Sequence, residues 1–148
     1  MYKDTITLFN RYESKLGDTW YPSVLKNVNL NTDKRFILTN YGADSQDNAV
    51  LNVKYTEKDG QIMIGDKKWL SPIRWDEQTN DLLPGSLTFY GGNEFDFFWV
   101  GEWPDEEPIS DEEYGGFYSY MSKNHDDVFR ITSVSRLSVI PHFEIVGR

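Results

Sequence analysis

Short segments rich in β-branched and aromatic residues run through the chain, and residues that favour turns separate them. This spacing constrains the fold more than any other feature, because it is typical of an antiparallel β-barrel or β-sandwich. A chain of 148 residues has about the length of one ordinary domain. We therefore expect a single, mainly β domain with extended loops over residues 1–148. The expected strands are 5–9, 24–30, 35–38, 50–55, 61–64, 67–70, 86–90, 95–100, 128–134 and 138–146.

Two dipeptides mark the clearest turns in this pattern. Asp59-Gly60 separates the expected strands 50–55 and 61–64, and Gly65-Asp66 precedes the strand 67–70. Glycine readily adopts the positive φ that tight hairpin turns require. The sequence therefore predicts that these three strands form a meander.

Three other segments have distinctive compositions. Residues 95–100 are nearly all aromatic, which predicts a strand that is buried on both faces. Residues 41–48 are small and polar without periodicity, so we expect a surface loop that could contact a neighbouring subunit. Pro141 cannot donate to a strand ladder, which predicts an edge strand or a bulge around it.

One short helix is predicted, over about residues 111–124. Ser110 and Glu113 have the spacing of a capping box. The dipeptide Gly115-Gly116 costs about 1 kcal/mol per glycine relative to alanine in a helix. We therefore expect the helix to depend on packing its apolar face against the sheet. That face consists of residues at helical spacing, namely Tyr114, Phe117, Tyr118 and Met121.

Charge is distributed unevenly along the chain. The formal net charge is −9, from 15 Lys and Arg against 24 Asp and Glu. Residues 1–75 carry a net +2, whereas residues 76–148 carry −11. The negative electrostatic field of a protein with this net charge repels the phosphate backbone of nucleic acids, which disfavours general nucleic-acid binding. The excess is densest in residues 102–113, here called the acidic segment, which belongs to an expected loop-helix insertion over about 101–125. Its candidate interaction or channel-facing residues are Glu102, Asp105, Glu106, Glu107, Asp111, Glu112 and Glu113.

Few residues suggest chemistry. The chain has no cysteine, and its two histidines, His125 and His142, lack the spacing of a metal-binding pair. No nucleophile, phosphate-binding or EF-hand motif occurs. We therefore expect no catalytic residue, cofactor or metal, and no enzymatic activity. A carboxylate pair of the glycosidase type, with Asp96 and Glu102 as the nearest candidates, is the weaker alternative.

Aromatic residues make up 16% of the chain. Large aromatic side chains are buried in a core, anchor a protein interface or stack on sugars. Trp20, Tyr21, Trp99 and Trp103 are the interface candidates. An exposed aromatic row would instead indicate a carbohydrate-binding β-sandwich.

No stretch approaches the roughly 20 apolar residues that a membrane-spanning helix needs. The N-terminus also lacks the basic and then apolar layout of a signal peptide. We therefore expect a soluble protein without membrane association.

Both ends of the chain resemble the small head–tail joining proteins of tailed phages that infect Gram-positive bacteria. At the start, the resemblance covers residues 3–12, which include ITLFNRY, and residues 19–28, which include WYPSVLKNV. At the end it covers residues 129–134 (FRITSV) and 139–147. The chain as a whole is similar to an uncharacterised family of prophage structural proteins from Firmicutes.

This resemblance implies a small β-barrel that acts as a head-closure protein in the connector between portal and tail. A tail-completion or tail-terminator protein is the alternative within the same class. The implied partners are adaptor, portal or tail-tube proteins, in a homo-oligomeric ring through which DNA passes without specific binding. The implied locations are the bacterial host cytoplasm during assembly and then the virion. We expect the acidic segment to face the channel or a basic surface of a partner.

Overall fold

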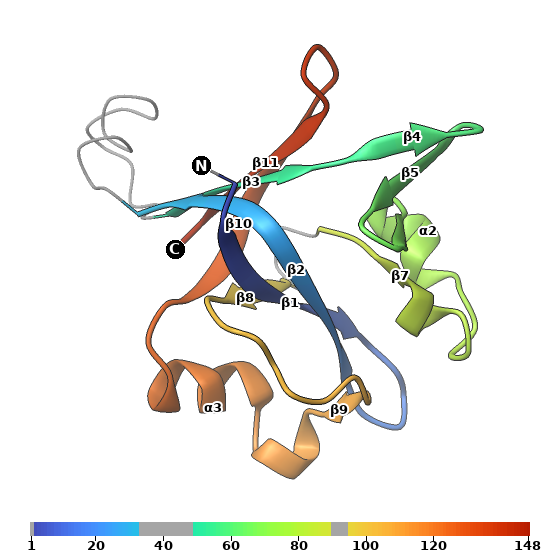
Figure 1. Ribbon diagram of the computed structural model, residues 1–148. Coiled ribbons are helices and arrows are strands. Elements are labelled where there is room, and N and C mark those ends of the chain that lie inside the picture. Colours follow the sequence, from blue (N-terminus) through green and yellow to red (C-terminus); the bar gives the residue numbers. More distant parts are fainter. Residues whose placement is uncertain (1, 33–48, 90–94) are drawn as a thin grey trace.

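A closed antiparallel barrel forms the body of the computed structural model, which describes residues 2–32, 49–89 and 95–148 (Figure 1). Going around the barrel, each strand pairs with the next, and the last pairs with β1. The mainly β fold expected from the sequence is confirmed, and of the two expected forms, barrel or sandwich, the structure has the barrel. In spatial order its strands are β1 (Asp4–Tyr12), β8 (Phe97–Trp99), β10 (Val128–Leu137), β11 (His142–Gly147), β3 (Ala49–Lys54) and β2 (Thr19–Asn31).

Closure of the barrel depends on a bend in β2. The first part of β2 pairs with β1, and its last residues, Asn29–Asn31, pair with β3. Between these parts, the register with β1 skips Asn27, which has a φ of 59°. An extra residue of this kind is a β-bulge, which bends its strand, and asparagine tolerates positive φ better than most residues. The bulge therefore lets one strand take part in two sides of the barrel.

Strand β8 is buried on both faces, as its aromatic composition predicted. Phe97 and Phe98 are both fully buried. Phe98 packs with the barrel interior, whereas Phe97 packs outside the barrel against the helix α3 (Phe117–Asn124). The interior is filled by apolar side chains from all sides, including Ile6, Leu8, Leu25, Val28, Leu51, Val53, Ile131, Phe143 and Ile145.

A second, smaller sheet lies beside the barrel. It contains β4 (Thr56–Lys58), β5 (Gln61–Ile64), β6 (Lys67–Trp69) and β7 (Ser86–Leu87), in that order. The turn at Asp59-Gly60 has positive φ at both residues, as expected for a tight hairpin. The predicted meander is present, but its first strand was placed wrongly. The chain breaks at Tyr55, so that β3 belongs to the barrel and β4 starts the meander.

Other strand boundaries also differ from the sequence predictions. The segment 86–90 contributes only the short β7, which pairs with β6 in parallel. The segment 138–146 forms a strand only from His142 onwards, because residues 138–141 make the turn between β10 and β11. Pro141 therefore lies in this turn, where its missing N–H is not needed by a ladder. The expected strand 35–38 and loop 41–48 lie outside the described residues.

The predicted helix over 111–124 is interrupted. Its first part is a 3₁₀ turn, η2 (Glu112–Tyr114), and only its second part is α3. Gly115 and Gly116 separate the two parts. Their φ values are 64° and 104°, whereas residues of a right-handed helix have negative φ. One of the two hydrogen bonds of the predicted capping box is formed. The Glu113 N–H donates to Ser110 Oγ at 3.4 Å.

Two short helical segments were not predicted. These are α2 (Pro72–Asp76), which begins with a proline at its first turn, and η1 (Leu83–Gly85). Both lie between β6 and β7 and carry one buried residue each, Trp75 and Leu83. No described helix is long and apolar enough to cross a membrane.

Replacing Gly116 with alanine tests the break in the helix. The backbone there has a φ of 104°, so a Cβ atom is strained even though its nearest neighbour is 3.8 Å away. We expect Gly116→Ala to lower the free energy of unfolding by about 1–2 kcal/mol in urea denaturation. Gly85→Ala is the matched control, because its φ is ordinary and nothing lies within 4 Å of the added atom. Equal stability of the two variants would contradict the strained geometry.

Candidate interaction surface

The acidic segment is anchored to the barrel at both ends. Near its start, Thr7 Oγ1 donates to the Gly101 carbonyl at 2.8 Å and accepts from the Trp103 N–H at 3.0 Å. Near its end, β9 (Ile109–Ser110) pairs with the first residues of β2. The segment is therefore a fixed part of the surface.

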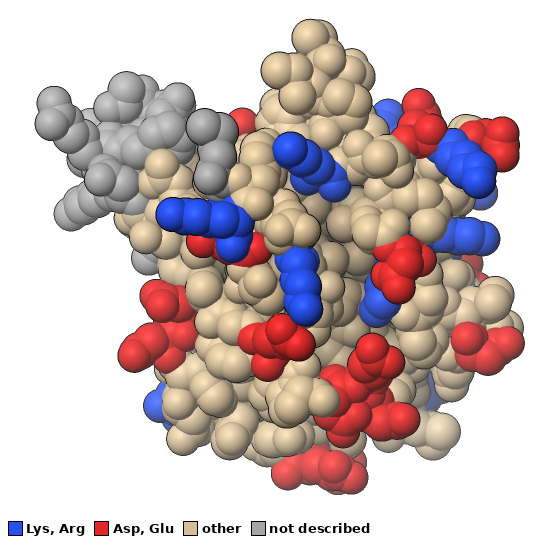
Figure 2. All heavy atoms as spheres, in the orientation of Figure 1, with Lys and Arg blue, Asp and Glu red and all other residues tan. Residues whose placement is uncertain are grey.

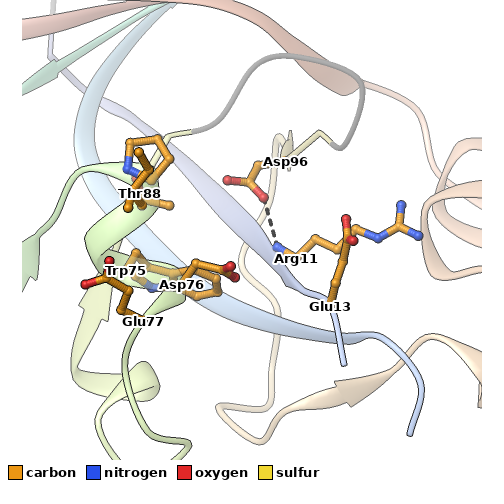
Figure 3. A pocket seen from close by; sticks show the side chains of 9 residues that line it. Arg11, Glu13, Trp75, Asp76, Glu77, Thr88 and Asp96 are labelled. Atoms are coloured by element: carbon orange, nitrogen blue, oxygen red, sulfur yellow. Dashed lines mark hydrogen bonds between the residues drawn. The ribbon is translucent and has the colours of Figure 1, made fainter. Parts of the chain in front are cut away.

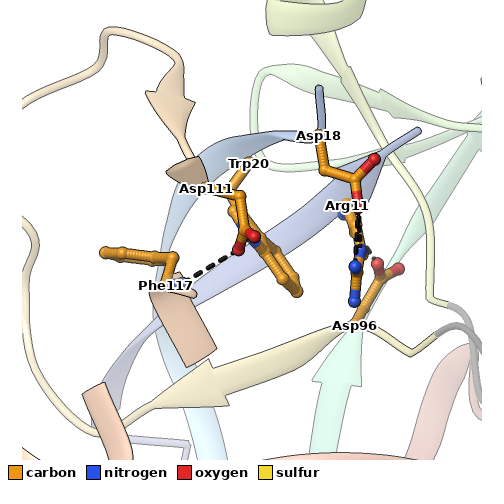
Figure 4. A network of polar contacts seen from close by, with 6 residues as sticks. All are labelled: Arg11, Asp18, Trp20, Asp96, Asp111 and Phe117. Atoms are coloured by element: carbon orange, nitrogen blue, oxygen red, sulfur yellow. Dashed lines mark hydrogen bonds and ion pairs between the residues drawn. The ribbon is translucent and has the colours of Figure 1, made fainter. Parts of the chain in front are cut away.

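The carboxylate of Asp111 holds the end of this segment in place (Figure 4). Its Oδ1 accepts hydrogen bonds from Trp20 Nε1 and from the Phe117 N–H, both at 2.8 Å. The second bond satisfies a free N–H group at the start of α3, where a negative charge is also favourable. The Asp111 N–H donates to the Asp18 carbonyl at 3.0 Å. Asp111 thus joins β2, the acidic segment and α3, which differs from the expected role at a channel or partner surface.

The other six acidic candidates are exposed. Acidic side chains gather on the lower part of the face shown in Figure 2, on the side where β9 and α3 lie in Figure 1. One ion pair partly neutralises them, with Lys26 Nζ 3.7 Å from Glu102 Oε1. The exposed candidates are Glu102, Asp105, Glu106, Glu107, Glu112 and Glu113.

Lys67 connects the smaller sheet to the barrel close to this acidic surface. Its Nζ donates to Ser23 Oγ at 2.8 Å and to the Pro22 carbonyl at 3.3 Å. Burial lowers the pKa of Lys67, and the carboxylates of Asp66 and Glu106 oppose this effect. The influence of Glu106 indicates that the acidic segment extends towards the junction between the two sheets.

The aromatic interface candidates divide into two groups. Trp20 is fully buried and Tyr21 is 7% exposed, so both are core residues, which corrects the expectation that they form an interface. Trp99 and Trp103 are half-buried, and their rings stand nearly perpendicular at a centroid distance of 6.3 Å. Gly101 permits this arrangement, because a Cβ atom there would lie 2.6 Å from the Trp99 ring. Two perpendicular rings do not provide the flat row expected of a sugar-stacking surface.

The weaker glycosidase alternative gains no support from the placement of its residues. Asp96 is 2% exposed and accepts from Asn10 Nδ2 and from the Arg11 N–H, both at 2.8 Å. Glu102 is exposed and does not line the cavity that Asp96 lines. Within the described residues, no group of three or more His, Cys, Asp or Glu could hold a metal ion.

A cavity of about 380 Å³ lies between β1, α2 and the residues Thr88 and Asp96 (Figure 3). Sequence reasoning missed it, because its walls come from segments far apart in the chain. Its polar lining residues are Arg11, Glu13, Asp76, Glu77, Thr88 and Asp96.

The tip of the β10–β11 hairpin is a second feature that the sequence did not reveal. This hairpin projects away from the barrel (Figure 1). Val139 is 96% exposed, Ile140 is 70% exposed and Leu137 is 40% exposed. Exposed aliphatic residues that gather in one place mark contact sites more often than isolated ones do. The tip could not be recognised from the sequence, because β-branched residues such as Val139 and Ile140 are also typical of a strand.

The sequence model of a family of unknown function matches residues 1–148. The chain belongs to the DUF6751 family. No curated protein and no solved structure matches it.

Replacing Asp111 tests its anchoring role. We expect Asp111→Ala to lower the free energy of unfolding by about 2–3 kcal/mol, because the buried Trp20 N–H and the start of α3 both lose their acceptor. Urea denaturation followed by tryptophan fluorescence measures this change. Glu107→Ala, in the same segment but exposed, should change stability by less than about 0.5 kcal/mol. A loss no larger for Asp111→Ala than for Glu107→Ala would show that the carboxylate is not an anchor.

Proposed function

We propose that this protein is a virion assembly protein of the head-closure or head–tail joining type, which acts through shape and contacts and not through catalysis. The segments that carry the resemblance to joining proteins form two hairpins, β1–β2 and β10–β11. These hairpins supply most of the barrel, and a small barrel is the fold that the resemblance implies.

The observation that carries this proposal is the projecting β10–β11 hairpin. Its tip leaves Val139 96% and Ile140 70% exposed, and burial of apolar surface is worth about 25 cal/mol per Å². A partner that covers the tip would gain this free energy without any change in the barrel. A hairpin that projects from a barrel and exposes apolar side chains at its tip suits a protein that joins neighbouring subunits.

The exposed carboxylates of the acidic segment suit the same role. Double-stranded DNA carries a dense negative charge, so a surface rich in carboxylates does not bind it. A connector has to let DNA pass without retaining it. The anchoring by Thr7 and Asp111 keeps these charges in one place on the subunit.

Deletion of the gene in a lysogen that carries it tests the proposed function. After induction, we expect DNA-filled heads and separate tails in electron micrographs, and restoration of infectious particles by the wild-type gene. Tails of irregular length would instead favour the tail-terminator alternative. Normal yields of infectious particles without the gene would contradict the proposal.

The hairpin tip can be tested in the same complementation assay. We expect the double substitution Val139→Ser and Ile140→Ser to reduce infectious particles at least 100-fold while stability stays within about 0.5 kcal/mol, because both side chains are exposed. Leu16→Ser is the matched control, since Leu16 is 96% exposed in the β1–β2 loop. Full complementation by the double variant would rule out docking through the tip.

Removing the negative charges of the acidic segment tests whether they prevent DNA binding. Replacing its six exposed acids by their amides changes the formal net charge from −9 to −3. We expect this variant to bind double-stranded DNA at low salt, where the wild type does not, and to package or release DNA poorly. Electrophoretic mobility shifts and particle counts measure both effects. Wild-type behaviour in both assays would show that the acidic segment has no such role.

A further inference from the structure

The connection between β6 and β7 exposes aliphatic side chains, as the hairpin tip does. Residues 72–85, here called the α2–η1 segment, contain both helical pieces of this connection. Ile73 is 73% exposed and Leu82 is 56% exposed. Because monomeric proteins rarely expose large aliphatic side chains in groups, such groups mark contact sites. The molecule therefore carries two exposed aliphatic surfaces, the hairpin tip and the α2–η1 segment.

Buried contacts hold the α2–η1 segment in place. Trp75 of α2 and Leu83 of η1 are buried in one apolar cluster. Gln78 Nε2 donates to the Trp75 carbonyl at 3.1 Å and to Ser86 Oγ at 2.8 Å, which links the end of α2 to β7. The aliphatic side chains thus stand on a fixed base, so a partner can bind there without first ordering the segment.

The two aliphatic surfaces carry opposite charges. Three exposed acids and one exposed cation lie in the α2–η1 segment, namely Asp76, Glu77, Asp81 and Arg74. Residues 135–142 of the hairpin include one exposed cation, Arg136, and no acid. Unlike charges across an interface favour association and fix its orientation, whereas like charges oppose it. The hairpin tip and the α2–η1 segment are therefore complementary in charge, and both are apolar.

This complementarity selects one contact among the possible ones. Two tips packed together would bring two Arg136 side chains together, and two α2–η1 segments would bring their carboxylates together. Within one subunit the tip and α2 lie apart (Figure 1). A second copy can cover both aliphatic surfaces of every subunit through a single type of contact. A different protein on the tip would leave the α2–η1 segment exposed.

We propose that the hairpin tip of one copy docks on the α2–η1 segment of a second copy. Val139 and Ile140 pack against the aliphatic residues of the segment, and Arg136 faces its carboxylates. The second copy is the partner of the tip, so this inference rests on the docking role that the proposed function gives to the tip. Because the contact joins two different surfaces, its repetition produces a ring or a filament.

Cross-linking between engineered cysteines tests this contact, because the chain has no cysteine of its own. We mix Val139→Cys with Leu82→Cys at about 1 mM protein, where weak contacts are populated. With a short bis-maleimide, we expect at least tenfold more dimer from the mixture than from either variant alone. In the control mixture, Glu107→Cys replaces Leu82→Cys, because Glu107 is exposed in the acidic segment.

Two results of this experiment would overturn the proposal. One is a dimer yield from the mixture that is no higher than the yield from the control mixture. The other is equally efficient cross-linking of Val139→Cys alone, which would show that two tips contact each other.

A charge exchange tests the orientation of the contact. Arg136→Glu in the Val139→Cys copy should lower the dimer yield at least fivefold, because the new carboxylate meets the acids of the α2–η1 segment. Asp76→Lys with Glu77→Lys in the other copy should restore the yield. All three substituted residues are exposed, so folding is preserved. An unchanged yield with Arg136→Glu, or no restoration by the lysines, would overturn the assigned orientation.

A matched control separates a specific contact from general attraction between charged proteins. Glu112→Lys with Glu113→Lys makes the same change in net charge within the acidic segment, where both residues are exposed. This variant should not restore cross-linking to the Arg136→Glu copy. Equal restoration by the control would show that net charge alone acts, and would overturn the site.

The contact and the proposed function fail in different ways. Cross-linking uses the purified protein, so its result does not depend on phage particles. Efficient cross-linking between tip and segment, together with normal particle yields after gene deletion, would contradict the proposed function alone. Loss of particles after gene deletion, together with cross-linking at the control level, would overturn this contact alone.

Discussion

The buried carboxylate of Asp96 is the polar group on which the strand arrangement depends. The carboxylate accepts hydrogen bonds from the side chain of Asn10 and the backbone N–H of Arg11. The main-chain carbonyl of the same residue accepts from the Ile131 N–H at 3.0 Å. A carboxylate removed from water costs several kcal/mol unless it is fully bonded. These bonds tie β1, β8 and β10 together and fix the register of β8. A slip by one residue would exchange the faces of Phe97 and Phe98.

Local sequence signals predicted the barrel well, and long-range contacts explain most of the differences. The alternation of β-branched residues and the Asp59-Gly60 turn depend on neighbours in sequence, so both were predictable. The break at Gly115-Gly116 was not, because a glycine pair lowers helix propensity without revealing a positive φ. Residues 138–141 have strand composition, yet the hairpin needs them for its turn.

The candidate surface was predicted only in part for a similar reason. Exposure of the acidic segment follows from its composition, whereas the special role of Asp111 depends on Trp20, which lies 91 residues earlier in the chain. Trp20 itself is buried against Phe97 and Phe117, although composition alone had suggested it for an interface. The cavity is assembled from β1, α2 and two further segments, so no single stretch of sequence could indicate it.

The acidic segment and α3 together form a cover over the outer aromatic face of the barrel. Phe9, Phe97 and Trp20 are fully buried there, although all three come from barrel strands. The cover is attached to the barrel through a two-residue strand, the Thr7 bonds and Asp111, which hold it over this aromatic face. Without this cover, the aromatic side chains of β1, β2 and β8 would face water. The insertion thus has two sides of opposite character, an apolar side that keeps the aromatic face of the barrel from water and a charged side that meets the solvent.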